Sequence, residues 1–308
     1  MKFTDWLTPD NVRGAPDPDG VPGEIPRDHY GRPLLPQQDK SGVWSDVPFT
    51  RASTVAGAYE VTRALMDWDA RAVAAGMAAR PDLCREVAAL TASGPDALTD
   101  PAVRAGVNAA VQMAREVAGG RKAARHGSCV HTMADPAREG RSMPTTVDTV
   151  GDTAVRADVT ALRKMLTECR IRQLPQAEIF VANQHMRVAG SIDGLFALPS
   201  GRVVVGDIKT GRHRHIVQWC IQLTAYATSM RYTHDVTTPP GTRWTPIHPD
   251  IDKSMALVFA PNVSTKPYVI NTSPGLLGLA CTAHRASSMR GAREMGICAE
   301  YDVTDYDV

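Results

Sequence analysis

Two contrasting patterns of polar and apolar residues open the chain. Residues 8–40 carry seven prolines among glycines and charged residues, a composition that favours an extended and poorly packed segment. We therefore predict an extended N-terminal arm without regular structure over residues 1–50. From Ser53 the sequence becomes rich in alanine, with apolar residues at helical spacing, and this pattern predicts a helical region over residues 51–120.

Helix-boundary signals support this helical region. Ser53 or Thr54 can cap its first helix, and Pro81 begins a second helical stretch. Asp100-Pro101 places an N-cap residue before a proline at the first helical position, which predicts a further helix that ends at Gly119-Gly120. The N-terminal third is therefore expected to be helical.

The remaining sequence, residues 121–308, alternates between helical spacing and short β-branched runs. The pattern predicts two helices, three strands, a helix, two strands and a final helix, at 121–135, about 155–170, 177–184, 186–198, 202–209, 215–231, 254–260, 267–271 and 273–294. This order indicates an α/β fold whose core is formed by residues 121–308, with a helical N-terminal extension.

The hairpin between the second and third strands makes a geometric prediction about two aspartates. If Pro199-Ser200-Gly201 form a three-residue loop, counting back along both strands places Asp193 opposite Asp207. Directly opposed side chains have Cβ atoms about 4.5–5.5 Å apart, so the two carboxylates would repel each other unless a cation lay between them. The two-residue period of a strand then places Lys209 on the same face as Asp207.

This acidic pair with its lysine has two possible interpretations. Carboxylate oxygens suit Mg²⁺ or Mn²⁺, and such an ion could activate water for phosphodiester hydrolysis while the lysine neutralises developing charge. Alternatively, the three residues form an exposed ion-pair patch of little energetic consequence. Val203, Val204 and Val205 precede Asp207 and indicate a strand buried on both faces, where unpaired charge is costly, so we favour the metal site.

The overall composition limits the partners and the compartment. The formal net charge is only +1, so any contact with DNA must depend on local cations, for which Arg212 and Arg214 beside the proposed site are the best candidates. The six cysteines are scattered without a C-x-x-C pair, which argues against a zinc ribbon and for reduced thiols. With a polar N-terminus and no run as long as a membrane span, we expect a cytoplasmic protein without membrane contact.

Three ordered motifs resemble those of the RecB-like branch of the PD-(D/E)xK nuclease superfamily, which includes phage exonucleases. They are G-x-x-D at Gly190 to Asp193, D-x-K at Asp207 to Lys209, and Q-x-x-x-Y at Gln222 to Tyr226. The resemblance covers roughly residues 121–270. It implies a nuclease core with a central mixed β-sheet flanked by helices, a Mg²⁺-dependent or Mn²⁺-dependent deoxyribonuclease activity, DNA as substrate, and phage recombination or replication proteins as partners.

The resemblance also implies roles for three further residues. His131, in Gly127-Ser128-Cys129-Val130-His131, matches the family's first motif and would add a metal ligand. Gln222 and Tyr226, one helical turn apart, would support Lys209 and the DNA backbone. The alternatives are a histidine satisfied in the core or on the surface, and a core tyrosine with a capping glutamine. A zinc site of His126, Cys129 and His131 is disfavoured, because the five-residue offset turns the two histidines apart.

Two more residues have open interpretations. Glu178 on the preceding strand could contact a second metal ion or the lysine, or it could simply be solvated at a strand end. Trp219, one turn before Gln222, could stack on a base, although we favour a core position.

The sequence also departs from parts of the family pattern. Cys281 and Cys298 lack the third nearby cysteine of the relatives that hold an iron–sulfur cluster, so we expect no cluster. A phosphate-binding G-x-x-x-x-G-K-[ST] loop is missing too, so we expect no nucleotide cofactor. We expect an exonuclease on DNA ends or single strands. The alternatives are a catalytically inactive DNA-binding or structural protein of the same fold, and a sequence-specific endonuclease.

Overall fold

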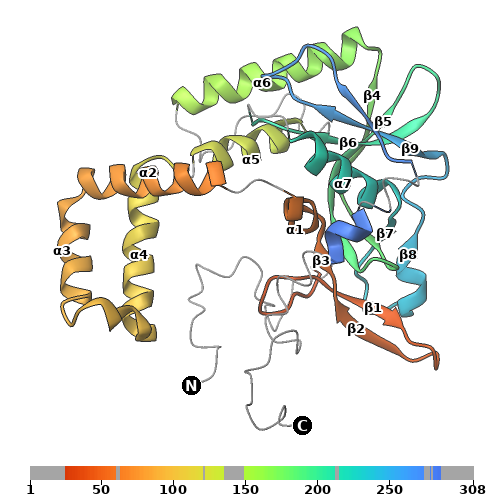
Figure 1. Cartoon of the computed structure of the whole chain (residues 1–308). Helices are drawn as coiled ribbons and strands as arrows, with labels where there is room; N and C mark the ends of the chain where they lie inside the picture. Colours follow the sequence, from red (N-terminus) through yellow and green to blue (C-terminus); the bar gives the residue numbers. More distant parts are fainter. Residues whose placement is uncertain are drawn as a thin grey trace, which may run out of the picture.

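A mixed β-sheet forms the centre of the protein, and helices cover both of its faces (Figure 1). The computed structural model describes residues 25–59, 63–120, 122–134, 149–211, 215–273, 278 and 280–285. Within these residues the sheet has eight strands: seven follow the order β10-β9-β6-β5-β4-β7-β8, and β3 pairs with β5. The predicted α/β class with a mixed sheet and flanking helices is therefore confirmed.

Three consecutive strands form an antiparallel meander at the middle of this sheet. They are β4 (Arg172–Asn183), β5 (Val188–Ala197) and β6 (Val203–Ile208). The sequence predicts this meander, although β4 begins five residues before the predicted start at residue 177, because its first residues continue the pairing with β5.

The β5–β6 hairpin has the loop and the register expected from the sequence. The backbone N–H of Leu198 donates to the carbonyl of Arg202 over 2.8 Å, which closes a loop of three residues. Gly201 in this loop has a φ of 84°, a left-handed conformation that glycine adopts without steric cost. Gly194 pairs with Gly206, so the predicted register is confirmed up to one residue short of the two aspartates.

Strand β9 (Ile251–Phe259) lies parallel to β6 on its other side. The chain passes from β6 to β9 through helix α7 (Ile216–Ala227), and β10 (Tyr268–Asn271) then pairs antiparallel with β9. The parallel pairing places Phe259 beside Ile208 at the carboxyl end of β6. In open sheets, ligands commonly bind beyond the carboxyl ends of parallel strands.

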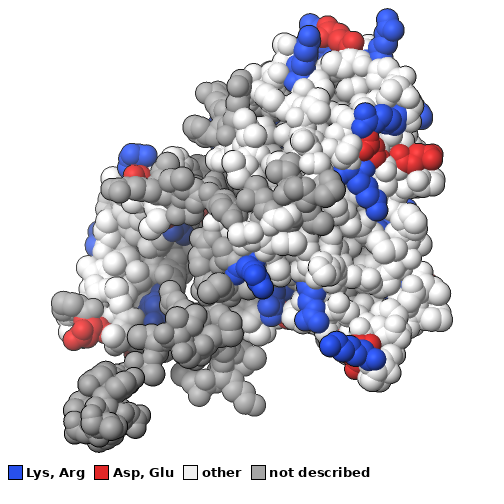
Figure 2. Space-filling view, turned by 45° about the vertical axis from the view of Figure 1, so that its right-hand side comes forward, with Lys and Arg blue, Asp and Glu red and all other residues white. Residues whose placement is uncertain are grey.

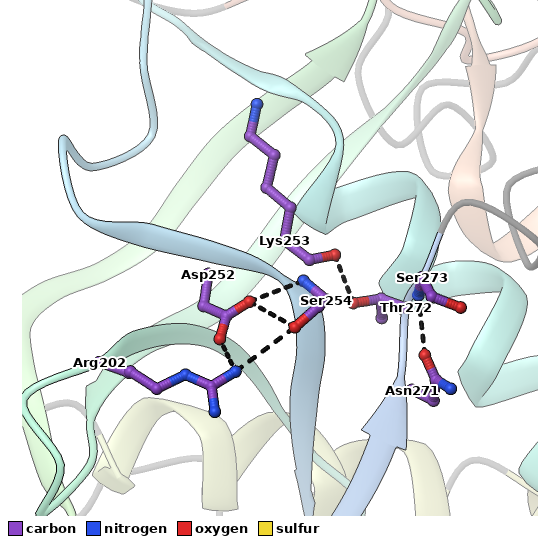
Figure 3. Close-up of polar contacts among 7 residues, drawn as sticks. All are labelled: Arg202, Asp252, Lys253, Ser254, Asn271, Thr272 and Ser273. Atoms are coloured by element: carbon purple, nitrogen blue, oxygen red, sulfur yellow. Dashed lines mark hydrogen bonds and ion pairs between the residues drawn. The ribbon is translucent and has the colours of Figure 1, made fainter.

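A polar network fixes the opposite ends of the same two strands (Figure 3). Arg202, directly before β6, forms an ion pair with Asp252 of β9. The Asp252 carboxylate also accepts hydrogen bonds from the backbone N–H and the hydroxyl of Ser254, at 2.8 and 2.7 Å. Next to it, the Thr272 hydroxyl donates to the carbonyl of Lys253 over 2.7 Å. These contacts hold the starts of β6 and β9 and the end of β10 together.

Alternate residues of β6 contribute to two hydrophobic layers, one on each face of the sheet. Val203 and Val205 pack in the layer that contains α7, whereas Val204 and Ile208 pack in the layer beneath two other helices. Those helices are α5 (Lys122–Ala134) and α6 (Thr149–Glu168). All six residues of β6 are buried, as the continuous apolar run predicts.

The region between residues 51 and 120 is helical over its described part. Its helices are α1 (Ala52–Ala56), η2 (Gly57–Tyr59), α2 (Arg63–Ala79), α3 (Pro81–Leu90), η3 (Pro95–Thr99) and α4 (Pro101–Val117). The Asp100 side chain accepts a hydrogen bond from the Ala102 N–H over 2.7 Å, so the predicted N-cap is confirmed. Figure 1 shows α2, α3 and α4 projecting to one side of the sheet.

The predicted absence of regular structure in the N-terminal arm is wrong for the described residues. Strands β1 (Leu34–Gln38) and β2 (Trp44–Pro48) form a hairpin, and β3 (Thr50–Arg51) pairs with β5. Leu35 and Phe49 are fully buried in a cluster with residues of β4, β5 and the β7–β8 edge. In the sequence, the many prolines outweigh these few apolar positions. Strands that lie far along the chain bury them. Residues 1–24 lie outside the described part.

Several boundaries also differ from the expected ones. Strands β7 (Met230–Tyr232) and β8 (Trp244–Thr245) are absent from the sequence-based expectation, because strands this short contain too few alternating residues to give a strand pattern. Helix α6 begins six residues before the expected start at residue 155. The expected final helix at 273–294 is described only at residues 278 and 280–285, which are helical. Across the described chain, every helix is too short or too polar to cross a membrane.

Candidate active site

The carboxyl end of β6 carries the acidic and basic residues of the D-x-K motif. Asp207 is the penultimate residue of β6, and Lys209 follows its last residue. The backbone N–H of Lys209 donates to the carbonyl of Phe259 over 2.8 Å, so the parallel pairing with β9 continues to this residue. The Lys209 backbone is therefore held by the sheet.

The two aspartates meet where the β5–β6 ladder ends. Backbone pairing stops at Gly194 and Gly206, one position before Asp193 and Asp207. Beyond this point a side chain takes over from the backbone as hydrogen-bond acceptor. Asp193 Oδ2 accepts a hydrogen bond from the backbone N–H of Ile208 over 2.6 Å. This bond draws the Asp193 carboxylate to the end of β6, where its charge acts directly on Asp207.

Asp207 is a buried acid with a basic neighbour. Its exposed fraction is only 4%, and its Oδ2 lies 2.6 Å from Lys209 Nζ in an ion pair without hydrogen-bond geometry. Burial raises the pKa of Asp207, and the nearby charge of Asp193 raises it further, to about 6 despite the opposing effect of Lys209. In the metal-free protein, the ionised Asp207 carboxylate therefore destabilises the folded state near neutral pH.

Lys209 keeps its proton in this setting. Burial alone would lower its pKa, but the charges of Asp207 and Asp193 outweigh burial, and the net effect is a raised pKa. Lys209 is therefore a fixed positive charge near neutral pH and is unsuited to act as a general base.

His131 joins the acidic pair from helix α5. Its Nδ1 lies 3.1 Å from Asp193 Oδ1. Burial lowers the pKa of His131, but the hydrogen bond to Asp193 and the charges of Asp193 and Asp207 produce a net rise. Helix α5 approaches the residue after Lys209 closely at Gly127, where a Cβ would lie 3.0 Å from Thr210 Oγ1.

Gln222 and Tyr226 lie together on α7, on the opposite face of the sheet from α5. The Gln222 amide donates to the Tyr226 hydroxyl over 3.2 Å. Tyr226 packs against Gly190 so closely that a Cβ at Gly190 would lie 2.6 Å from the hydroxyl oxygen. Burial raises the pKa of Tyr226, with a smaller contribution from the charges of Asp207 and Asp193, so its phenol stays protonated. Trp219 is buried in the core, as expected.

The other expected residues fall into two groups. Arg212 and Arg214 lie outside the described residues, and so does the Glu178 side chain, although β4 includes position 178. His126 Nε2 lies 2.8 Å from Asp158 Oδ2 on α6, a contact that links the two helices rather than forming a zinc site with His131.

The acidic pair provides donors that suit Mg²⁺. Mg²⁺ commonly binds through one or two carboxylates, while water and substrate phosphates complete its shell. Asp193 and Asp207 fit this pattern, and the buried Asp207 Oδ2 has the Lys209 ammonium as its partner in an ion pair. The described chain contains no group of three His, Cys, Asp or Glu side chains placed to hold a metal ion. His131 lies beside the acidic pair through its contact with Asp193, and its expected role as a metal ligand stays a prediction.

Sequence reasoning missed the contacts that support the site from outside the motifs. The Asn262 side-chain amide donates to the carbonyl of Thr210 over 2.5 Å, from a turn 52 residues further along the chain. No local pattern could reveal this pair. Gly127 did carry a signal, because a glycine inside a helical pattern often marks a close approach.

Comparison of the chain with protein-family models and with curated proteins finds no match.

Proposed function

We propose that this protein is a metal-dependent DNA nuclease, an exonuclease acting on DNA ends or single strands. The observation that carries the proposal is the cluster of Asp193, Asp207, Lys209 and His131 at the carboxyl end of β6. These residues come from three elements and include the D-x-K and G-x-x-D motifs. The mixed sheet with helices on both faces is the architecture that the motif resemblance implies.

The energetic cost of the cluster argues for a functional site rather than a purely structural ion pair. A buried carboxylate whose pKa is raised to about 6 destabilises the folded state at neutral pH. Apolar residues of similar volume could fill such a position at equal or greater stability. Functional sites are the places where such costs commonly persist.

The chain's own residues have distinct roles in the proposed reaction. Lys209, which keeps its proton, would place a fixed positive charge beside the reacting phosphate as negative charge develops on it. Tyr226, buried on α7, accepts the Gln222 hydrogen bond and packs against Gly190, so this pair would support the strand that carries Asp193. His131 would hold the Asp193 carboxylate in place.

Asp193 and Asp207 would hold the metal ion. A bound Mg²⁺ or Mn²⁺ would supply a Lewis acid for the phosphoryl oxygen and lower the pKa of a bound water. Phage replication or recombination proteins would be natural partners of an exonuclease of this kind.

The test is cleavage of labelled linear, circular and single-stranded DNA with Mg²⁺, with Mn²⁺ and with EDTA. Wild-type protein should degrade linear or single-stranded DNA with either metal and spare it in EDTA. Asp207→Asn and Lys209→Ala should each lose cleavage by at least about a hundredfold, the scale on which removal of one charge-stabilising group acts.

Matched controls come from the far end of the sheet. Asp252→Asn and Lys253→Ala change the same residue types within the network of Figure 3, away from the site, and should retain cleavage. Folded wild-type protein that cleaves none of the substrates with either metal would refute the proposal and favour the inactive DNA-binding alternative. Equal loss in the controls would refute the residue assignment.

A further inference from the structure

The turn between β9 and β10, residues 261–267, lies at the same end of the sheet as Lys209. Phe259, the last residue of β9, pairs with Ile208 and accepts the hydrogen bond of the Lys209 N–H. The turn therefore starts two residues beyond a direct backbone contact with the proposed catalytic strand.

Strand register places Lys266 near Lys209. Tyr268 pairs with Val258, and Ile208 pairs with Phe259. If both registers continued for one or two residues beyond the last recorded pairs, Lys266 would lie opposite Ala260, and Ala260 would lie beside Lys209. Neighbouring strands lie about 4.8 Å apart, so the backbones of the two lysines are roughly 10 Å apart, a span of a few phosphates along a DNA strand.

Hydrogen bonds hold the turn against the site. The Asn262 side chain donates to the carbonyl of Thr210 over 2.5 Å, which connects the turn to the residue after Lys209. Within the turn, the Ser264 hydroxyl donates to the carbonyl of Lys266 over 2.8 Å and accepts from its N–H over 3.2 Å. The position of the Lys266 backbone is therefore fixed relative to the acidic pair.

The charge of Lys266 is available at the surface. Its side chain is exposed, and the described residues provide it with no acidic partner in an ion pair. On the face drawn in Figure 2, basic side chains occur in several small groups and form no continuous band, consistent with a net charge of only +1. A DNA strand that reaches the site must therefore be held by a few local cations.

We propose that the 261–267 turn forms one wall of the DNA path and that Lys266 contacts a backbone phosphate near the one being cleaved. This inference rests on the proposed nuclease function and names a surface that the sequence motifs do not include. Lysine recognises phosphate as a point charge, so the contact would be independent of base sequence.

Lys253 provides a matched control at the other end of β9 from the turn. It is an exposed lysine near the start of β9, at the opposite end of the sheet from Lys209. Its side chain extends away from the polar network in Figure 3. Lys253→Ala and Lys266→Ala therefore remove the same charge, the first near the start of β9 and the second in the turn that follows β9.

The experiment measures binding of fluorescent linear DNA to the full chain in EDTA, over a series of KCl concentrations. Loss of one phosphate contact should flatten the plot of log affinity against log salt by about 0.7 to 0.9, or roughly sixfold weaker binding at 0.1 M salt. We expect this change in Lys266→Ala, for several unrelated DNA sequences, and a wild-type slope in Lys253→Ala.

Failure of this inference is distinguishable from failure of the proposed function. If wild-type protein cleaves DNA and Lys266→Ala binds with the wild-type slope, the turn is not part of the DNA path, although the nuclease proposal stands. Equal loss in both lysine variants would overturn the inference as well, because it would indicate a general charge effect. Wild-type protein that neither binds nor cleaves DNA would refute both proposals together.

Discussion

Replacing Asp207 with asparagine should stabilise the metal-free protein at pH 8. Asp207 is 4% exposed, and burial together with the charge of Asp193 raises its pKa from 3.8 to about 6. Asparagine has nearly the same shape and no charge, so it removes the cost of a buried carboxylate without opening a cavity. Lys209 loses its partner, but 29% of its side chain is exposed and water can solvate the ammonium.

The magnitude follows from the difference between the folded and unfolded pKa. A pKa that rises from 3.8 to about 6 on folding means that the ionised carboxylate destabilises the fold by about 3 kcal/mol, at about 1.4 kcal/mol per pH unit. This figure already includes the ion pair with Lys209. It is an upper value for Asp207→Asn, because the amide must also be accommodated in a buried position.

The sign of the pH dependence is fixed by the raised pKa. Between about pH 4 and pH 6 the folded wild-type protein binds more protons at Asp207 than the unfolded chain does, so the free energy of unfolding falls as pH rises. The favourable contribution of the neutral acid is complete below the unfolded pKa and is lost as pH rises through the folded pKa. The advantage of Asp207→Asn should therefore be small near pH 4 and reach its full size above pH 6.5.

Urea unfolding in EDTA at several pH values measures this advantage, and added Mg²⁺ tests its cause. At a Mg²⁺ concentration a hundredfold above Kd, binding should stabilise wild-type protein by about 2.7 kcal/mol, whereas Asp207→Asn should gain much less. The control Asp252→Asn breaks a partly exposed ion pair with Arg202 and should lose no more than about 1 kcal/mol, with little change from added metal. An Asp207→Asn protein that is less stable than wild type in EDTA at pH 8, or an advantage that does not change with pH, would refute the reasoning.

Three further substitutions test the supports of the site. Gly190→Ala should lower the free energy of unfolding by roughly 1–3 kcal/mol, because the added Cβ overpacks against Tyr226. In the double variant, Tyr226→Phe should restore part of this loss. Additive effects of the two substitutions in thermal or urea unfolding would contradict the contact. His131→Gln should lose stability of order 1 kcal/mol at pH 6 and less at pH 9, because the raised pKa of His131 makes its contact with Asp193 strongest below the unfolded pKa. A loss that is equal at both pH values would show that the histidine contributes through packing alone.

The sequence by itself determined the parts of the fold that depend on neighbouring residues. The loop at Pro199-Ser200-Gly201 fixed the hairpin register, since a three-residue loop allows one pairing of its flanking strands, and this brought Asp193 to the level of Asp207. The N-cap at Asp100 also acts within one turn of its own helix. Such features are local, so the residue types and their spacing suffice to predict them.

Only the tertiary structure decided which distant segments support the site. The bond from Asn262 to Thr210 and the parallel pairing of β6 with β9 each join residues separated by many positions in the chain. The motifs are visible in the sequence, but the residue at which the β5–β6 backbone pairing ends is not. There the Asp193 side chain, instead of a backbone carbonyl, accepts the hydrogen bond of the Ile208 N–H. These contacts depend on the summed burial of two hydrophobic layers, which sets how closely α5, α7 and the sheet approach. This burial involves residues from the whole fold, so a short stretch of sequence does not determine it.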